Sequence, residues 1–168
     1  LRMTPTDGGI NRLSHLPKDM PLFINGEKGA FYRVYLNSKL SGWILKTDVD
    51  QDYENSVQTP VLLKDVIITE QREFNLYKFQ LSAQVPFVLK EEEGKDGRIG
   101  LTLQLFNIQR VQDNSYSLNF PIPKLIGYEG HYEGTNFILK IRKVQQINLD
   151  NPFRNIVIAV DAGHGGSE

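Results

Sequence analysis

Apolar and polar residues alternate along much of the chain, with the period of two that half-buried β-strands show. The alternation is clear at 79–85, 99–105 and 137–142, and a β-branched apolar stretch covers 61–69. The polar sequence EEEGKDG at 91–97 has the composition of a solvated turn, so we expect the first two of these segments to form a long antiparallel hairpin. The pattern predicts an antiparallel β-sandwich over residues 60–150.

Residues 1–50 have a different hydrophobic pattern, in which short apolar segments are separated by tight turns. Phe31 to Leu36 predicts one strand and Gly42 to Ile44 opens another, with a Gly-Glu-Lys-Gly turn before them. This spacing is typical of a small β-barrel, whose first strand we expect to be clipped at Leu1. The polar stretch 50–60 separates it from the sandwich. Because so short a barrel is only marginally stable alone, we expect it to dock against the sandwich.

The end of the chain has a third pattern. Residues 156–160 form a continuous apolar run without alternation, which is typical of a strand that is buried on both faces of a parallel sheet. The run is followed by the loop Asp-Ala-Gly-His-Gly-Gly, whose histidine is His164. Open α/β sheets place their chemistry at this end of a strand, and flanking glycines let a loop present an imidazole closely to a metal or substrate. We therefore expect the overall class to be mainly β, with a C-terminal strand of the kind found in α/β domains, of which these residues would hold only the beginning.

Composition narrows the possible functions. Among 168 residues, 19 basic and 20 acidic side chains nearly cancel, which argues against a general nucleic-acid binder. Cysteine is absent, so thiol nucleophiles, thiolate zinc sites and disulfides are excluded. No apolar run reaches the roughly 18–20 residues of a transmembrane segment. These features fit an exported protein, periplasmic or extracellular.

The motifs of residues 1–50 resemble the bacterial SH3-like domain. Its entry motif, its turn and strand, and its terminal GW[IV] correspond here to LPKDM, GEKGAFYRV and GWI. Asp19 stands where the family usually has glycine, and Phe31 where it often has tryptophan. The resemblance implies attachment to the cell wall through peptidoglycan or its stem peptides. The side chains of Tyr32, Tyr35 and Trp43 could then stack on sugar or peptide, although in so small a barrel they could equally be core.

The middle segment is similar to the β-domains that precede the catalytic domain of some bacterial wall amidases, among them the AMIN domain, a targeting β-sandwich. The similar stretch runs from Gly127 and Tyr128 through Tyr132 to the strand that ends at Arg142. No acid–base pair or metal-ligand spacing stands out in this segment. His131 lies alone between glycine and tyrosine and is expected to be a solvated loop residue.

The string IVIAVDAGHGG at 156–166 resembles the opening strand and loop of the zinc-dependent N-acetylmuramoyl-L-alanine amidases. The resemblance implies that 155–168 begins the catalytic domain, that His164 is the first zinc ligand, and that Asp161 fixes the loop behind it. The family's ligand glutamate, second histidine and general base have no counterpart in these residues.

Two functions remain open from the sequence. In the first, the chain is the peptidoglycan-binding region of a cell-wall amidase, a hydrolase that cleaves the amide between N-acetylmuramic acid and L-alanine. This chain alone is then expected to be inactive, because catalytic zinc takes three protein ligands and only His164 is present. In the second, the chain is a stand-alone wall-binding or regulatory protein without catalysis.

Overall fold

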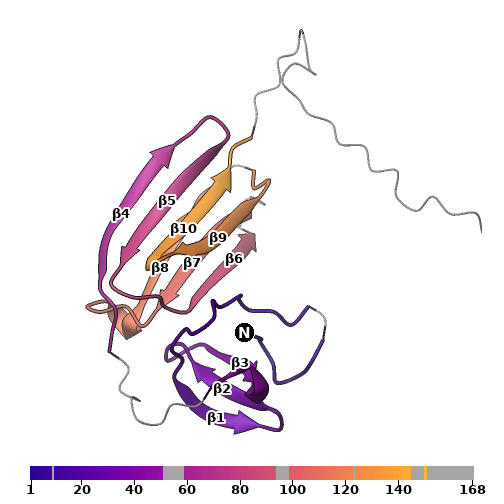
Figure 1. Cartoon of the computed structure of the whole chain (residues 1–168). Helices are drawn as coiled ribbons and strands as arrows, with labels where there is room; N and C mark the ends of the chain where they lie inside the picture. The colour runs from indigo at the N-terminus through magenta and orange to yellow at the C-terminus, as the bar shows by residue number, and fades with distance from the viewer. Residues whose placement is uncertain (9, 51–58, 94–98, 123, 145–149, 151–168) are drawn as a thin grey trace, which may run out of the picture.

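The structure, a computed structural model, describes residues 1–8, 10–50, 59–93, 99–122, 124–144 and 150. These residues form three antiparallel sheets, two of which stack into a sandwich while the third lies at one end of it (Figure 1). The mainly β class is therefore confirmed. The two helical segments of the described chain are single 3-10 turns, and no helix there could cross a membrane. The strand expected at 156–160, with the loop that follows it, lies outside the described residues.

The N-terminal unit is a sheet of three strands in the order β1-β2-β3. Its elements are β1 (Ile24–Lys28), β2 (Phe31–Tyr35), β3 (Ser41–Leu45) and the 3-10 turn η1 (Lys46–Asp48). Gly29 takes a left-handed φ of 56° in the turn between β1 and β2, a conformation that glycine adopts without strain. The strands expected from 31 and from 42 are present.

The expected barrel does not close within the described residues. The sheet has the open order β1-β2-β3, and only an isolated bridge from Arg2 to Trp43 continues it beyond β3. The N-terminal segment therefore contributes a single point of pairing rather than a full strand, which leaves no second strand to join β3 back to β1. The correction is to a three-stranded antiparallel sheet.

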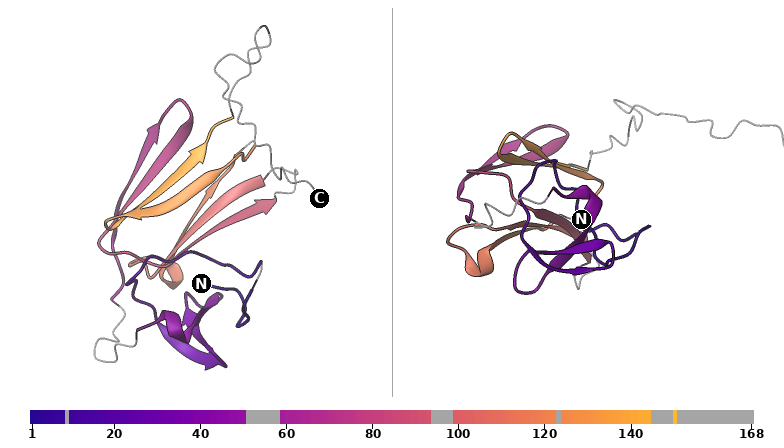
Figure 2. Two further views of the ribbon diagram at one scale, coloured as in Figure 1. Left: turned by 45° about the vertical axis from the view of Figure 1, so that its right-hand side comes forward. Right: turned by 60° about the horizontal axis from the view of Figure 1, so that its bottom comes forward.

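The sandwich consists of a four-stranded sheet, in the order β4-β5-β10-β9, and a three-stranded sheet, in the order β6-β7-β8. Figure 2 shows the two layers from the side. The first sheet contains β4 (Leu63–Glu70), β5 (Phe74–Leu81), β9 (Tyr128–Glu133) and β10 (Asn136–Arg142). The second contains β6 (Phe87–Glu93), β7 (Ile99–Phe106) and β8 (Ser115–Phe120), with the 3-10 turn η2 (Gln112–Asn114) before β8.

Aromatic side chains from both layers fill the space between the sheets. Phe87 of β6 packs on Phe137 of β10 with ring centroids 4.5 Å apart, and Tyr77 of β5 lies edge-on to Phe120 of β8 at 4.7 Å. Phe79 and Phe137 are fully buried. The inward positions of each strand thus supply a single core, as alternation in a sandwich requires.

The expected hairpin is wrong in one of its partners. β7 pairs with Phe87–Glu93, and the strand that includes Phe79 lies in the other sheet, between β4 and β10. After Leu81 the chain crosses from one layer to the other and resumes as β6. The acidic sequence at 91–93 therefore continues a strand instead of beginning the turn.

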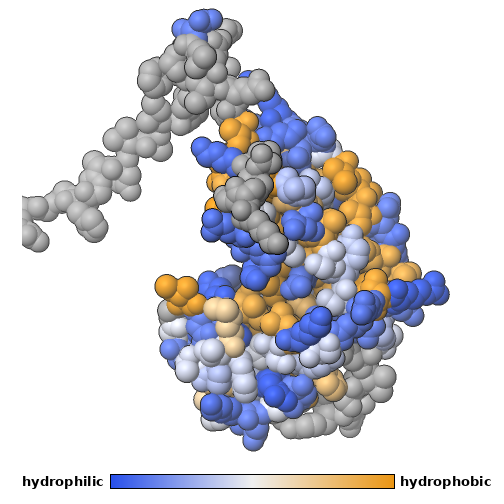
Figure 3. All heavy atoms as spheres, turned by 180° about the vertical axis from the view of Figure 1, so that it is seen from behind, coloured by the Kyte–Doolittle hydropathy of each residue, from blue (hydrophilic) through white to orange (hydrophobic). Residues whose placement is uncertain are grey.

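The small sheet packs against the end of the sandwich where β6 begins and β7 ends. This docking was expected, because so small a unit is only marginally stable alone. Val34 and Leu36 form one buried cluster with Val88 of β6 and Phe106 of β7. Hydrophobic side chains gather where the two units meet (Figure 3). Asp113 adds a polar contact, since its carboxylate accepts hydrogen bonds from the Ser38 hydroxyl at 2.6 Å and the Ser38 N–H at 3.0 Å.

Candidate ligand-binding face

The register of β1, β2 and β3 sorts the expected aromatic residues onto two faces. Val34 is opposite Ile24 and Gly42, and it points into the buried cluster below the sandwich. Since side chains alternate along a strand, Tyr32 shares the face of Val34, whereas Tyr35 lies on the other face. Trp43 is opposite Arg33 and so lies on the same face as Tyr35. The structure therefore brings Tyr35 and Trp43 together but not Tyr32.

Tyr32 has its own set of neighbours. The Lys46 ammonium lies 5.1 Å from the centre of the Tyr32 ring and 2.8 Å from a carboxylate oxygen of Glu27. The hydrogen bond that Lys46 donates to the Glu27 carboxylate raises the pKa of Lys46 above its usual range. Because an ammonium over an aromatic face is attracted by the ring quadrupole, Tyr32 has a local structural partner on its face of the sheet.

The opposite surface carries Phe23, Arg33, Tyr35 and Trp43, and we call it the outer face of the small sheet. Phe23 is 41% exposed and meets the Tyr35 ring edge-on, with centroids 5.9 Å apart. Tyr35 and Trp43 are half-buried, and Arg33 is exposed. None of these four residues belongs to the cluster that docks the small sheet on the sandwich.

Hydrogen bonds to Asn25 of the neighbouring strand β1 hold the Arg33 side chain on this face. Its Nε donates to Asn25 Oδ1 at 2.9 Å, and one terminal nitrogen donates to the Asn25 carbonyl at 3.2 Å. Gly26 makes room for it, because a Cβ there would come within 3.3 Å of Arg33 Nε. The guanidinium is thus positioned beside aromatic rings while it stays accessible. Such a surface suits a ligand that has apolar flat faces and a carboxylate or hydroxyl group.

Sequence reasoning missed Phe23 and Arg33. Arg33 could have been predicted from the sequence. It precedes Tyr35 by two positions, and residues two apart lie on the same face of a strand. The position of Trp43 relative to Tyr35 depended on the β2–β3 register, which the alternation of either strand alone does not determine.

The expected metal-site residues, His164 and Asp161, lie outside the described residues. Within the described part of the chain, no group of three histidine, aspartate or glutamate side chains could hold a metal ion. His131 lies in β9 and not in a loop, with Glu129 and Glu133 each 3.4 Å from its ring nitrogens. His15 Nε2 lies 2.6 Å from a guanidinium nitrogen of Arg12. Both described histidines therefore have local polar partners.

Comparison of the chain with models of known families, with curated proteins and with solved structures found no match. The assignment of a function therefore depends on the motifs of the chain and on the chemistry of its surfaces.

Proposed function

We propose that this chain is the peptidoglycan-binding region of an exported, zinc-dependent N-acetylmuramoyl-L-alanine amidase. The string IVIAVDAGHGG at 156–166 supports the amidase part of the proposal, as an apolar run followed by a glycine-flanked histidine. The SH3-like motifs of 1–50 and the AMIN-like stretch of the sandwich support wall binding. The three segments follow one another in the order that a wall amidase uses.

The observation that carries the binding role is the outer face of the small sheet. Tyr35 and Trp43 flank an exposed Arg33 that is fixed by Asn25, on the side of the sheet that does not dock on the sandwich. Aromatic rings can stack on sugar rings or peptide planes, and a guanidinium can bind a carboxylate with two hydrogen bonds. Peptidoglycan offers all of these groups.

The catalytic role of this chain is restricted to one zinc ligand, His164, with Asp161 fixing the loop that presents it. In the complete catalytic domain, His164 would be one of the residues that hold zinc, and the metal would supply Lewis-acid chemistry for hydrolysis of the amide. A catalytic site needs three protein ligands, and this chain offers one candidate in the amidase motif. We therefore expect the 168-residue chain to bind the wall without cleaving it.

Cosedimentation with insoluble peptidoglycan tests the binding role. Replacing both Tyr35 and Trp43 by alanine should weaken binding at least about fivefold, since each ring contact is worth about 0.5–1.5 kcal/mol and two of them together about 1–3 kcal/mol. Tyr32→Ala is the matched control, because it removes the same side chain from the other face of the same strand. Arg33→Gln, which leaves both rings in place, should weaken binding on its own.

Two sedimentation results would contradict the proposed binding role. Equal sedimentation of the wild type, the double variant and Arg33→Gln, all folded by circular dichroism, would remove the outer face from the proposal. A wild-type chain that does not sediment would remove wall binding itself.

A further inference from the structure

The strand β4 forms an open edge of the four-stranded sheet. Its one neighbour is β5, and no described strand lies on its other side (Figure 1). It also extends past the second sheet, because β8, at the end of that sheet, faces β5 through the contact of Tyr77 with Phe120. Ile68 is therefore 61% exposed, although it shares a face of β4 with the partly buried Val66.

The centre of this edge is apolar, whereas two other edges of the sandwich are charged. β6 carries a run of charged residues at 90–93, and β9 carries Glu129 and Glu133. In the middle of β4, by contrast, Ile67 is 40% and Ile68 61% exposed. Natural sheets protect an edge with charge or cover it with another segment, because an apolar edge pairs readily with a further strand.

The backbone groups that β4 offers at its edge follow from the hairpin with β5. Gln71 N–H donates to the Phe74 carbonyl at 2.9 Å, and hydrogen-bonded pairs then alternate along the ladder. The N–H and C=O groups of Val66 and Ile68 therefore point to the open edge. Val66 N–H agrees with this direction, since it donates to Asp65 Oδ1 at 2.8 Å and not to β5.

We propose that β4 pairs with β4 of a second copy of this chain. The two strands run antiparallel about a twofold axis at Ile67, so that the two four-stranded sheets join into one. Val66 of each copy exchanges backbone hydrogen bonds with Ile68 of the other, in place of the local bond to Asp65. Isologous pairing about a twofold axis is the commonest form of homodimer.

The side chains of β4 select this register. Edge-facing groups also meet if Val66 pairs with Val66, but Lys64 then lies opposite Ile68. They meet again if Ile68 pairs with Ile68, but Glu70 then lies opposite Val66. The register centred on Ile67 places Lys64 opposite Glu70 at both ends and apolar residues opposite each other between them. Opposite charges that face each other across two strands stabilise the pair, so β4 is complementary to itself.

The charged ends of β4 are accessible to a second copy. Lys64 is exposed, and it lies at the irregularity between Leu63 and Asp65, so its flexible side chain makes the terminal contact. The Glu70 side chain is 79% exposed, and its carboxylate lies 3.4 Å from the Lys143 ammonium. A carboxylate can accept hydrogen bonds from both lysines at once.

Disulfide cross-linking tests the register, because the chain contains no cysteine of its own. Ile67→Cys should form a covalent dimer under mild oxidation, since Cα atoms in such a pair lie about 4.5 Å apart, within the range of a disulfide. Thr69→Cys and Asp65→Cys should not cross-link alone, because their equivalents in the second copy are offset by about 13 Å along the strands. Mixed together, these two variants should cross-link to each other.

Sedimentation velocity over a range of concentrations tests the contacts. Ile67→Lys places like charges opposite each other and should weaken dimerisation at least about fivefold. Ile99→Lys is the matched control, because Ile99 is 42% exposed on the central strand β7 and should have no effect. Lys64→Glu and Glu70→Lys should each weaken the dimer, and the variant that carries both should return to within about twofold of the wild type.

A wild-type chain that stays monomeric up to its solubility limit would overturn the inference, as it would if the apolar run at 156–160 occupied the edge instead. Equal cross-linking of Ile67→Cys and Thr69→Cys, equal effects of Ile67→Lys and Ile99→Lys, or failure of the double charge exchange to restore dimers would overturn it as well. All variants are first shown to be folded by circular dichroism. Wall binding is independent of these results, since the outer face belongs to the small sheet.

Discussion

Gly130 shows how closely the two layers of the sandwich approach at a single residue. It lies in β9, and a Cβ on it would meet Leu89 Cδ1 of the opposite sheet at 2.6 Å and Phe137 Cζ at 2.9 Å. No real side chain tolerates such contacts without moving its neighbours. Glycine is therefore required here by packing and not by backbone conformation.

Gly130→Ala should lower the free energy of unfolding by about 1–3 kcal/mol, the usual cost of forcing extra volume into a packed core. Gly100→Ala is the control, because a Cβ there would approach only the flexible Asn119 side chain at 3.3 Å and backbone atoms at ordinary distances. Urea unfolding of the two variants measures the difference. Similar midpoints would show that the sheets are not in contact at Gly130.

Tyr132 joins β9 to the crossover between the layers through its hydroxyl group. The hydroxyl donates to the Val85 carbonyl at 2.7 Å and accepts from the Val85 N–H at 3.1 Å. Tyr132→Phe leaves both backbone groups without that partner and should cost about 1–3 kcal/mol of stability. Thermal unfolding at neutral pH checks this expectation.

The same hydroxyl predicts how stability changes at high pH. Burial raises the pKa of Tyr132 well above its usual range, so the folded state keeps a proton that the unfolded state loses above about pH 10. Stability is therefore fully present below pH 10 and decreases as pH rises further, by up to about 1.4 kcal/mol per pH unit for this group. Tyr132→Phe should lose less stability than the wild type between pH 10 and 11.5. Parallel pH profiles would contradict the role of the hydroxyl.

At the scale of elements, the loop between β7 and β8 connects the sandwich to the small sheet. Asn107, Arg110, Asp113 and Asn114 all have positive φ in this loop, which is unusual for residues other than glycine. The strained backbone places Asp113 so that its carboxylate accepts hydrogen bonds from Ser38. The loop thus complements the apolar contact of Val34 and Leu36 with the sandwich.

Asp113→Gly should loosen the docked small sheet, because it removes the carboxylate while relieving the left-handed backbone. With about 1 kcal/mol lost, hydrogen exchange in β2 and β3 should accelerate roughly fivefold, while β5 and β10 remain unchanged. Asn114→Gly is the control, as its φ of 48° is also left-handed. If hydrogen exchange in β2 and β3 accelerates equally in both variants, the effect comes from the loop backbone and not from the Asp113 carboxylate.

The sequence predicted elements whose signal is local. The alternation around Phe137 identified β10, and the apolar positions around Phe31 and Trp43 identified β2 and β3. It did not predict that Phe79 and Ile99 lie in different sheets, because alternation reports which residues face a core and not which strand is the neighbour. The same limit applies to the site, since only the register places Trp43 with Tyr35 and apart from Tyr32.

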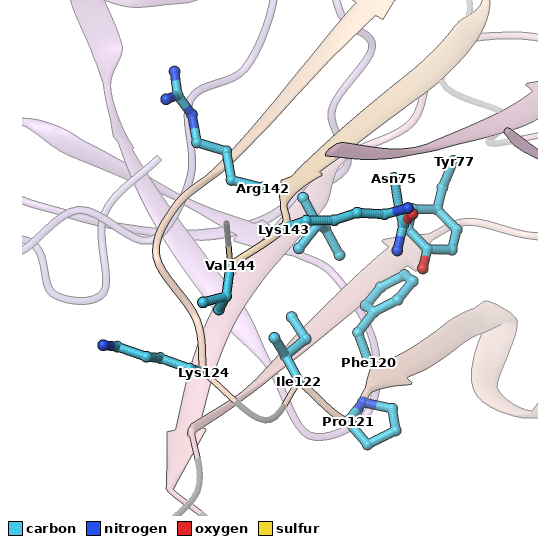
Figure 4. A pocket seen from close by; sticks show the side chains of 10 residues that line it. Asn75, Tyr77, Phe120, Pro121, Ile122, Lys124, Arg142, Lys143 and Val144 are labelled. Carbon is cyan, nitrogen blue, oxygen red and sulfur yellow. The ribbon is translucent and has the colours of Figure 1, made fainter. Parts of the chain in front are cut away.

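At the scale of the whole molecule, the small sheet and Val144 lie at opposite ends of the sandwich. The small sheet with its outer face lies at one end, and a cavity lined by Phe120, Ile122 and Val144 lies at the other (Figures 1 and 4). In the proposed amidase, the outer face and the zinc ligand His164 belong to separate segments of the chain. Loss of one should therefore leave the other intact.

His164→Ala in the proposed full-length amidase should abolish hydrolysis, because one of three zinc ligands is lost, and should leave wall binding unchanged, because the residues of the outer face are all still present. His131→Ala, in the sandwich, is the matched control and should retain activity. Hydrolysis is measured as dye release from labelled peptidoglycan. Activity that survives His164→Ala would remove this histidine from the zinc site.

The central claim is that this chain binds peptidoglycan without cleaving it. The most direct measurement incubates the folded 168-residue chain, with added zinc, on dye-labelled insoluble peptidoglycan and then separates pellet from supernatant. The proposal predicts protein in the pellet and no dye above background in the supernatant. Protein that stays in the supernatant, or dye that is released in proportion to the protein added, would contradict it.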